Sequence, residues 1–531
     1  MAKSLSYQPL NDFGVNGLNT QDNPATLDQS YLTSANNVVL RESGRISFRK
    51  GFKQKVVPTG TAIGSIVEHN DSGTNKIFAS HGTSIYTIDF TSPNAAFPSS
   101  GADVKHTVAN SSGNWQFVNF NERLHCFHSG VVPQRYDGSL GSGVKWTAHA
   151  TDPASISTLF DPSCAMGFYG RIWCGGVAEA KDVVYYSNLL DGDDWTGGDT
   201  GLIDLAKVWG TDEIVALAPF YGKLVIFGKN NIAIYDSPQT VGSLALNEVI
   251  RGIGCINRDT VQAIGDDLVF LSETGLRSLA RTTEKDKLPL TDLTVNIKDT
   301  IIRNIGQSTN VKSVYVENEG IYIMTFTDKN ITYIFDFKHI TPEGVPRITI
   351  WSFEADREPS SMIYTELYSG LLVGQKDGGI AGYEGYFDTD LAWVSSAASY
   401  TNSTISADVS SIWIRMGENI AASLLKKMIL VLEGGSGATL VLRWYKDFSM
   451  ISSATTEISL RPATTGSTAL WGASTSLWGD VKYTPIYGLQ EYTTPLTGSA
   501  KHLKLNLSIL SNGYDTSIQD LAIISKQGKI R

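Results

Sequence analysis

The side chains best suited to chemistry in this sequence are two histidines beside a cysteine, at His125, Cys126 and His128. Histidine and cysteine are the usual protein ligands of zinc and other transition metals. His125 and His128 are separated by an odd number of positions, which on a β-strand places the two imidazoles on opposite faces. The spacing therefore argues against one shared ion, and we predict no metal site here.

An acidic run from Asp191 to Asp194, followed by Trp195, offers carboxylates of the kind that bind calcium. The run lacks the alternating spacing and the distal glutamate of an EF-hand loop. It also departs from the Ser-x-Asp-x-Gly-x-x-Trp spacing of sialidase-type boxes, and it occurs once in the chain. We therefore interpret it as a solvated turn.

Motifs for catalysis are absent from the sequence, which has no G-x-S-x-G, no P-loop and no H-E-x-x-H. A pair of carboxylates brought together from distant loops stays open as an alternative. Since nothing in the sequence favours catalysis, we predict a protein that is not an enzyme and has no cofactor.

Composition gives the second set of limits. The 531 residues are 42% hydrophobic and 18% charged, with a net charge of −10, so the chain as a whole lacks the basic character of a nucleic-acid binder. We expect reduced, buried thiols for the four cysteines, because they form no metal-type doublet. The first residues lack the apolar segment of a secretory signal, and no apolar run is long enough to span a membrane as a helix. We expect a soluble protein made in a cytoplasm.

One basic patch stands out in this acidic chain. It consists of Arg41, Arg45, Arg49, Lys50, Lys53 and Lys55. Three interpretations remain open for it, namely docking on an acidic partner surface, contact with DNA phosphates, and a solvated strand face.

The elements that would position such side chains are β-hairpins. Residues 220–238 contain two apolar β-prone runs, 223–227 and 232–235, joined by a Gly/Asn-rich turn, which predicts an antiparallel hairpin. The same arrangement recurs about seven times, at a spacing of roughly 45 to 53 residues that is close to the period of propeller blades. The other paired runs are 76–79 with 85–89, 123–127 with 134–137, 171–174 with 183–187, 268–271 with 275–279, 321–324 with 331–336, and 371–374 with 380–383.

This repetition predicts an all-β protein with a β-propeller of six or seven blades over residues 61–392. Stacking the blades around an axis buries both faces of each small sheet. Three units open with aromatic residues (Phe168-Tyr169, Phe220-Tyr221 and Tyr368), which we expect to pack between neighbouring blades. Residues 292–305 are the best candidate for a short helix.

The flanking regions have a different texture. Residues 1–60 are rich in turn formers and predict an extended N-terminal arm. Residues 393–531 contain longer alternating strands, which predict a β-sandwich-like domain. Between these strands, Trp471 and Trp478 each precede a glycine in a Ser/Thr/Gly-rich loop, and we interpret them either as an interface anchor or as plugs over the sandwich core.

Two stretches of the sequence carry a family resemblance. GLNTQDNPATL at 17–27 and ANNVVLRESGRISFRKGF at 35–52 resemble the N-terminal signature of short-tailed bacteriophage (podovirus) tail proteins. That family includes the tail nozzle, or tail tubular protein B type, and the packaged-DNA stabilisation proteins. The segment 187–195 and the C-terminal tail 527–531 are also similar to this family.

The resemblance implies a virion structural protein of the tail, made in the bacterial host cytoplasm. Its members form a homohexameric ring below the portal and a tail adaptor ring, where they line and close the DNA exit channel until ejection. The implied partners are other copies of the chain, the adaptor, and tail fibres or spikes, and the ring would enclose double-stranded DNA without reading its sequence. The alternative is a propeller-type tail-associated protein that binds glycans or hydrolyses host polysaccharide.

Overall fold

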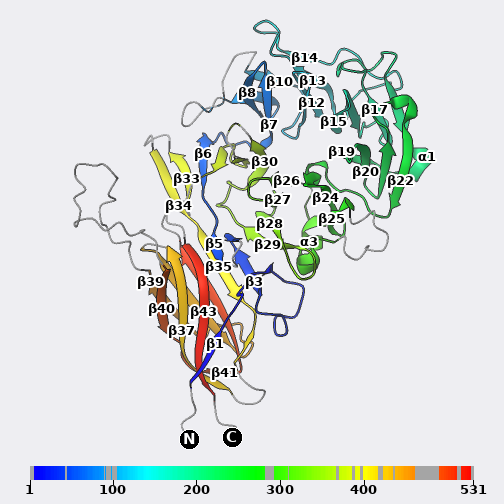
Figure 1. The fold of residues 1–531 in the computed structure, drawn as a ribbon. Helices are drawn as coiled ribbons and strands as arrows, with labels where there is room; N and C mark the ends of the chain where they lie inside the picture. Colours follow the sequence, from blue (N-terminus) through cyan, green and yellow to red (C-terminus); the bar gives the residue numbers. More distant parts are fainter. Residues whose placement is uncertain are drawn as a thin grey trace, which may run out of the picture. The chain divides into compact units, whose positions relative to one another are not determined.

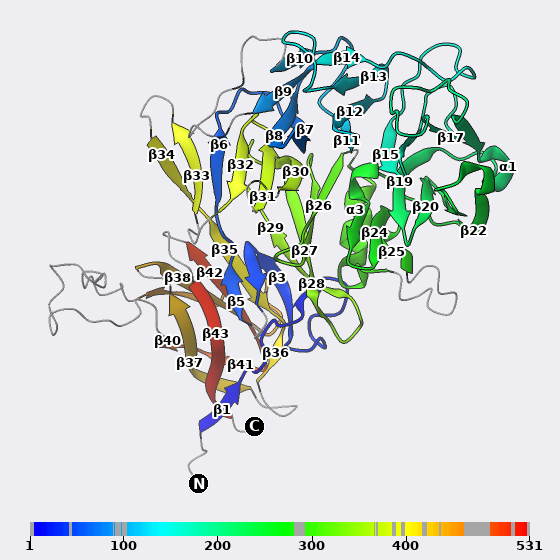
Figure 2. The same cartoon turned by 45° about the horizontal axis from the view of Figure 1, so that its top comes forward.

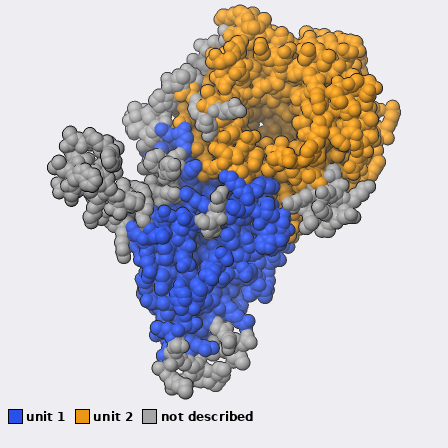
Figure 3. All heavy atoms as spheres, in the orientation of Figure 1, with its two compact units in different colours: residues 1–53, 333–352, 384–531 blue, residues 54–332, 353–383 orange. Residues whose placement is uncertain are grey.

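The computed structural model describes residues 5–41, 45–88, 90, 97, 104–280, 292–308, 310–365, 367, 370–384, 389–394, 399–416, 422–434, 437–460, 489–510 and 516–527. The chain divides into two compact units (Figure 3). Unit 1 comprises residues 1–53, 333–352 and 384–531, and unit 2 comprises residues 54–332 and 353–383. No helix in these described ranges is long and apolar enough to cross a membrane.

Unit 2 is a β-propeller, which confirms the main prediction from the sequence (Figures 1 and 2). Six groups of three or four antiparallel strands follow one another around an axis. They are β7 (Ile63–Asp71), β8 (Thr74–His81), β9 (Ser84–Ile88) and β10 (Lys105–Thr107); β11 (Gln116–Phe120), β12 (Arg123–His128), β13 (Val131–Tyr136) and β14 (Trp146–Ala148); β15 (Cys164–Phe168), β16 (Arg171–Gly175), β17 (Val183–Tyr186) and β18 (Gly201–Asp204); β19 (Ile214–Phe220), β20 (Lys223–Gly228), β21 (Asn231–Asp236) and β22 (Ala245–Arg251); β23 (Gln262–Ile264), β24 (Asp267–Ser272) and β25 (Gly275–Ser278); and β30 (Pro359–Thr365), β31 (Gly370–Gln375) and β32 (Ile380–Tyr383).

The ring is closed by contact between its first and last inner strands. The antiparallel pair β26 (Val311–Val316) and β27 (Ile321–Phe326) lies between the β23 and β30 groups, since β26 contacts both β23 and β30. β30 in turn contacts β7. Ile63 and Ile77 of the first group pack with Leu372 and Ile380 of the last in one buried cluster, so apolar burial joins the two ends of the ring.

The hydrophobic core of unit 2 lies between successive blades. Leu224 and Ile226 of β20 are fully buried and pack in one cluster with Trp173 and Val184 of the preceding blade. Phe168 packs against this cluster, and Phe220 packs against the next one. The expectation that these residues lie between blades is therefore confirmed for the two phenylalanines. Tyr169 and Tyr221 are instead 45% and 68% exposed, and Tyr368 lies outside the described residues.

Tight two-residue turns join the first and second strands of several blades. At Tyr169-Gly170 φ is 48° and 70°, and at Tyr221-Gly222 it is 47° and 75°. Asn121-Glu122 follows the same pattern, with φ of 49° and 59°. Two successive residues with positive φ define the type I′ turn, whose twist matches that of antiparallel strands.

Helices are short and few in the described part of unit 2. They are α1 (Ala206–Trp209), η1 (Val241–Ser243), η2 (Arg258–Thr260), η4 (Val295–Ile297) and α3 (Lys298–Ile305). The helix expected within 292–305 is present, but it begins at Val295. Asp292 instead accepts hydrogen bonds from the backbone N–H and the hydroxyl of Thr294, which hold the preceding turn.

Unit 1 contains the two sheets of a β-sandwich. The first sheet consists of β4 (Val38–Leu40), β5 (Ile46–Phe48), β43 (Thr516–Gln527), β37 (Ser423–Gly434) and β40 (Leu489–Pro495), with β1 (Leu5–Pro9) and β41 (Ser499–Ala500) at its sides. The second consists of β29 (Pro346–Trp351), β2 (Gly17–Leu18), β3 (Tyr31–Asn36), β35 (Ser406–Ser411), β42 (His502–Leu510), β38 (Thr439–Lys446) and β39 (Ala454–Ser459), with β36 (Ile414–Arg415) paired to β42.

The long strands of unit 1 bury alternate side chains, as the sequence predicts. Leu503, Leu505 and Leu507 of β42 are each at most 2% exposed. Met428 and Leu430 of β37 are fully buried. Period-two burial is the pattern of a strand with one face on a core.

The predicted N-terminal arm supplies strands to both sheets of unit 1. β1 pairs antiparallel with β43, joining Leu5 to Lys526, and β3 pairs with β35. A further hairpin, β33 (Thr389–Val394) with β34 (Ser399–Thr404), also belongs to this unit. The chain passes between the units within β6 (Phe52–Val56) and β28 (Ile331–Ile340). The compact units thus divide after residues 53, 332, 352 and 383. The sequence instead placed the boundaries near 60 and 392, where the repeated hairpin pattern begins and ends.

Candidate functional site

The basic patch separates into one buried residue and five that are at least partly exposed. The Arg49 side chain is 1% exposed. Its guanidinium donates to both carboxylate oxygens of Asp390, at 3.0 and 2.8 Å, and its Nε donates to Oδ1 of Asn37 at 3.0 Å. It also lies over the rings of Phe52 and Trp351, at 5.5 and 5.9 Å. Arg49 is therefore part of the interior of unit 1, and the prediction of an exposed contact is wrong for this residue.

The remaining basic residues lie at or near the surface. Arg41 and Arg45 are exposed, and Arg45 forms an ion pair with Glu433 at 3.3 Å. Lys50, Lys53 and Lys55 are partly buried. Lys55 belongs to unit 2 and the others to unit 1. Trp471 and Trp478 lie outside the described residues.

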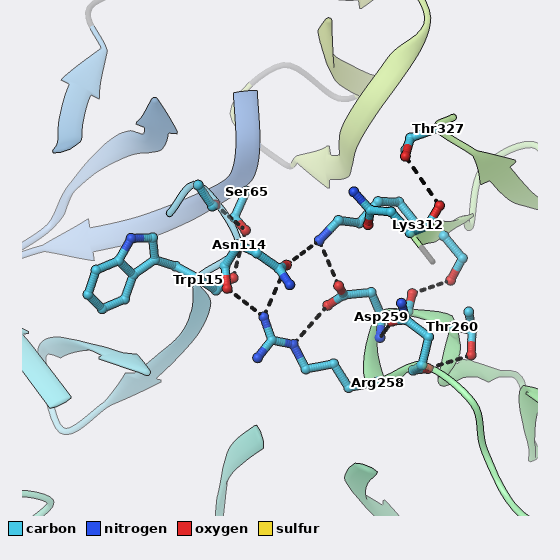
Figure 4. A network of polar contacts seen from close by, with 12 residues as sticks. Ser65, Asn114, Trp115, Arg258, Asp259, Thr260, Lys312 and Thr327 are labelled. Carbon is cyan, nitrogen blue, oxygen red and sulfur yellow. Dashed lines mark hydrogen bonds and ion pairs between the residues drawn. The ribbon is translucent and has the colours of Figure 1, made fainter. Parts of the chain in front are cut away.

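A polar network of unit 2 joins several blades at the propeller axis (Figure 4). Nζ of Lys312, on inner strand β26, donates to Asp259 at 2.7 Å and to Oδ1 of Asn114 at 2.6 Å. Arg258 of η2 forms an ion pair with Asp259 at 3.4 Å and donates to the backbone oxygen of Asn114 at 2.8 Å. Arg258 also donates to the carbonyl of Ser163. These contacts connect the segments just before β11, β15 and β23, which are inner strands of three different blades.

The charges in this network oppose one another. Although partial burial raises the pKa of Asp259, the cations of Lys312 and Arg258 more than offset this and hold it below its ordinary value. Burial lowers the pKa of Lys312, and repulsion from Arg258 adds to that effect, while Asp259 counteracts it. The single carboxylate is thus strongly held as an anion between two cations.

Beside this network lies a cavity of about 190 Å³ at the propeller axis. Its wall is formed by the inner strands β7, β11, β23, β26 and β30 together with η2, at residues 64–67, 115–117, 259, 262, 312–313 and 361–362. The inner segments approach closely here, because a Cβ on Gly64 would lie 2.1 Å from the carbonyl oxygen of Gly113. A space-filling view of unit 2 shows a hollow in its centre (Figure 3).

A second cluster of titratable groups lies between two blades, where His125, His149 and Asp193 are all buried. Nδ1 of His125 is 3.0 Å from Nε2 of His149. Oδ1 of Asp193 is 3.6 Å from the first nitrogen and 3.4 Å from the second. These separations resemble the about 3.3 Å between neighbouring ligands of a tetrahedral zinc ion with ~2.0 Å bonds.

Hydrogen bonding nevertheless does not fit a metal at this cluster. The indole N–H of Trp195 donates to Nδ1 of His149 at 3.2 Å. An indole is only a donor, so Nδ1 of His149 holds the lone pair and the proton sits on Nε2, the atom that would have to bind the metal. Arg135 and Arg123 form ion pairs with the other oxygen of Asp193 and would repel a cation. The cluster is a buried network of two neutral histidines and a paired carboxylate.

Asp193 corrects the interpretation of the acidic run as a solvated turn. Its side chain is 9% exposed and paired with arginines, whereas its neighbour Asp194 caps the turn by accepting from the backbone N–H of Thr196 and of Gly197, both at 2.9 Å. His149, which the sequence did not single out, lies far from the run in sequence. Only the contact of two blades brings these side chains together.

The four cysteines, Cys126, Cys164, Cys174 and Cys255, are all buried and free. Burial raises the pKa of each thiol, to about 12 for Cys164 and about 11 for Cys255. Thiols in this state are poor nucleophiles and poor ligands at neutral pH. The expectation of reduced core thiols is confirmed.

Comparisons with known proteins identify no family for this chain. No protein-family model matches the chain, and no curated protein matches it. Among solved structures, the WD40 domain of Pan2 from Neurospora crassa is similar over 61% of this chain and 90% of that domain, with 9% identity and a TM-score of 0.38. The propeller is therefore established by the arrangement of its own strands.

Proposed function

We propose that this protein is a structural assembly subunit rather than an enzyme. More particularly, we propose a tail nozzle subunit of a short-tailed bacteriophage, which forms a ring below the portal and adaptor, lines and closes the DNA exit channel, and allows genome ejection. The proposal rests on the resemblance of residues 17–27 and 35–52 to that family, together with one structural observation.

The observation is that two residues of the 35–52 stretch, Asn37 and Arg49, meet in one buried network of unit 1. Asn37 adopts a positive φ of 55°, and its side chain donates to the hydroxyl of Ser352 and the carbonyl of Ser406. Its Oδ1 accepts from Arg49 and from the backbone N–H of Ser352. Asn37 and Arg49 are therefore held in one folded arrangement, which supports a shared fold for chains that carry both residues in this stretch.

The polar network at the propeller axis bears on where DNA would pass. Duplex DNA, whose major groove alone is about 12 Å wide, is far too large to pass through the cavity of about 190 Å³ beside the Lys312–Asp259 pair. The passage in our proposal is therefore enclosed between subunits of a ring. Six copies at −10 each carry a formal charge of −60, and such a lumen would not grip phosphates as a basic one does.

Ring formation is the direct test. Negative-stain electron microscopy and native mass spectrometry of the purified protein, alone and mixed with the adaptor ring from the same phage, should reveal closed six-fold rings. Replacing the exposed Arg41 and Arg45 by glutamate should weaken capture by the adaptor while leaving the fold intact. Monomers alone in the presence of the adaptor would contradict the proposal. Loss of polysaccharide viscosity, abolished by a single Asp or Glu substitution, would instead support the glycan hydrolase.

A further inference from the structure

The hairpin of β38 and β39 in unit 1 ends in an exposed apolar tip, residues 447–451. Met450 and Ile451 are 91% and 80% exposed, and Phe448 is 49% exposed. Apolar side chains exposed singly are normal on a protein surface, whereas several together mark an interaction site. The tip is therefore a candidate for contact with a partner.

Asp447 and Phe448 hold the tip against the segment that opens β42. Both residues have a positive φ, of 49° and 66°. Oδ1 of Asp447 accepts from the backbone N–H groups of Lys501 and His502, at 2.8 and 3.0 Å. The Phe448 ring packs against the rings of Trp413 and His502, with centroids 5.0 and 4.6 Å apart. Because the turn is already ordered, binding through the tip loses little conformational entropy.

Basic side chains lie beside the tip, although the chain as a whole has a net charge of −10. The segments 413–416, 446–451 and 498–502 contact one another through the pairing of β36 with β42 and the hydrogen bonds to Asp447. Figure 2 shows β36 and β41 at the same end of unit 1. With histidine neutral, the charged side chains of these three segments are one acid, Asp447, and three bases, Arg415, Lys446 and Lys501.

This combination of apolar and basic side chains determines the class of partner. A lipid bilayer with anionic headgroups accepts apolar side chains at the boundary of its acyl region, and its surface charge attracts lysine and arginine. A stable complex with a folded protein needs about 800 Å² of surface on each side, which a five-residue turn does not supply. Insertion into a bilayer needs only the turn and its basic neighbours.

We propose that the tip is a membrane-docking turn. Met450 and Ile451 enter the interfacial region of an anionic bilayer, while Arg415, Lys446 and Lys501 contact lipid phosphates. The contact is peripheral and reversible, because so few apolar side chains fall short of a permanent anchor. This inference is independent of the proposed nozzle function. Ring formation and adaptor capture are assayed without lipid, so the two proposals fail separately.

The test measures binding of the full chain to vesicles of equal parts phosphatidylglycerol and phosphatidylcholine. Cosedimentation should show binding that weakens as sodium chloride is raised, and at least tenfold weaker binding to vesicles of phosphatidylcholine alone. A polarity-sensitive dye attached to Met450→Cys should shift its emission to the blue on the anionic vesicles. Selective labelling is possible because the four native cysteines are buried. The same dye on Ser243→Cys, at an exposed position of unit 2, should not shift.

Substitutions at the tip separate its two contributions. Met450→Asp combined with Ile451→Asp should weaken binding to anionic vesicles tenfold or more, because apolar side chains are replaced by charges that the bilayer repels. Lys446→Gln and Lys501→Gln should each weaken it about fivefold, as expected for one cation near an anionic surface. Leu246→Asp, at an exposed leucine of unit 2, is the matched control and should leave binding unchanged.

Two results would overturn the proposal directly. They are absence of binding to anionic vesicles by the wild type, and undiminished binding by the double aspartate variant. A third result would replace membrane docking by contact with a second copy of the chain. It is the formation of oligomers in analytical ultracentrifugation that the double variant abolishes, in a protein that does not bind vesicles.

Discussion

Arg49 and Asp390 form a two-point ion pair across 341 positions of sequence, with Nη1 bound to Oδ1 at 3.0 Å and Nη2 to Oδ2 at 2.8 Å. The Arg49 side chain is only 1% exposed, and Asp390 also accepts a hydrogen bond from the backbone N–H of Phe52 at 2.8 Å. Parallel hydrogen bonds between guanidinium and carboxylate fix direction as well as distance. The pair therefore holds the chain after β5 against β33 within unit 1.

Breaking this pair should destabilise unit 1 strongly. Arg49→Gln or Asp390→Asn leaves a buried partner without its counter-charge, for which we expect a loss of about 3–5 kcal/mol in the free energy of unfolding. Urea denaturation followed by circular dichroism measures the change. The matched control is Arg45→Gln, whose pair with Glu433 is 45% and 37% exposed and should contribute less than about 1 kcal/mol. Equal losses for Arg49 and Arg45 variants would contradict this interpretation.

The propeller core depends on Leu224. Leu224→Asp places a carboxylate among fully buried side chains of two blades and should prevent the propeller from folding. Leu246→Asp on the outer strand β22 of the same blade is the control, since Leu246 is 43% exposed and should tolerate the change within about 0.5 kcal/mol. Limited proteolysis of the two variants compares them directly. A Leu224→Asp protein that resists protease like the wild type would refute the assignment.

Stability should fall in mild acid because of the two buried histidines. Burial, with Arg135 and Arg123 nearby, lowers the pKa of His125 from 6.5 to about 3, and burial also depresses the pKa of His149. Between pH 6.5 and about pH 3, the unfolded chain binds a proton on His125 that the folded chain excludes. The free energy of unfolding therefore decreases as pH falls below 6.5. The loss attributable to His125 approaches about 1.4 kcal/mol per pH unit, and above pH 6.5 this contribution is constant.

The pH effect is measured by urea denaturation at pH 7.5, 6.0 and 5.0. Carboxylates elsewhere also titrate, so the informative quantity is the difference between the wild type and His125→Gln. The variant should be less stable at pH 7.5 but lose less stability on acidification. Parallel pH profiles for the two proteins would show that His125 is not buried as a neutral imidazole.

Zinc should not stabilise the protein through His125, His149 and Asp193. Trp195 donates to Nδ1 of His149, so the proton of this neutral imidazole sits on Nε2. Zinc binding at Nε2 would move that proton to Nδ1, where its N–H would face the indole N–H of Trp195. We expect the same unfolding temperature in EDTA and in equimolar zinc chloride. A zinc-dependent increase that disappears in His149→Ala would mean that the cluster is a metal site after all.

The Asn121-Glu122 turn offers a stabilising change. Glu122 is exposed and has a φ of 59°, a conformation that costs a residue with a Cβ about 1–2 kcal/mol. Glu122→Gly creates the Asn-Gly pair that type I′ turns prefer and should stabilise unit 2 by up to about 1 kcal/mol, since the more flexible unfolded chain offsets part of the gain. Glu122→Ala retains the strain and is the control. Equal unfolding temperatures for the glycine and alanine variants would argue against a type I′ turn here.

Much of the fold was predictable because its signals are local. Six of the seven predicted hairpins correspond to paired second and third strands of successive blades, such as β20 with β21 and β8 with β9. The seventh coincides with β27 and β28. An apolar run, a turn former and a second run occupy adjacent positions, so short-range sequence suffices to define them.

The inner strands were harder to recognise. β15 reads Cys-Ala-Met-Gly-Phe and β30 reads Pro-Ser-Ser-Met-Ile-Tyr-Thr. They carry small or polar residues because they crowd around the axis, and this gives them neither a long apolar run nor clean alternation. The exposure of Arg49 was also predicted wrongly. Composition cannot tell a charged residue at the surface from one that is paired in the interior.

The sequence by itself determined the all-β class, the repeated hairpins and the change to longer alternating strands toward the C-terminus. These depend on turn residues and periodicity, which act over a few positions. The tertiary structure alone decided that Arg49 meets Asp390, that His125 meets His149 and Asp193, and that Lys312 and Arg258 share one carboxylate at the propeller axis. Each of these contacts joins segments far apart in the chain, and the environment of a charge is set by its neighbours in space.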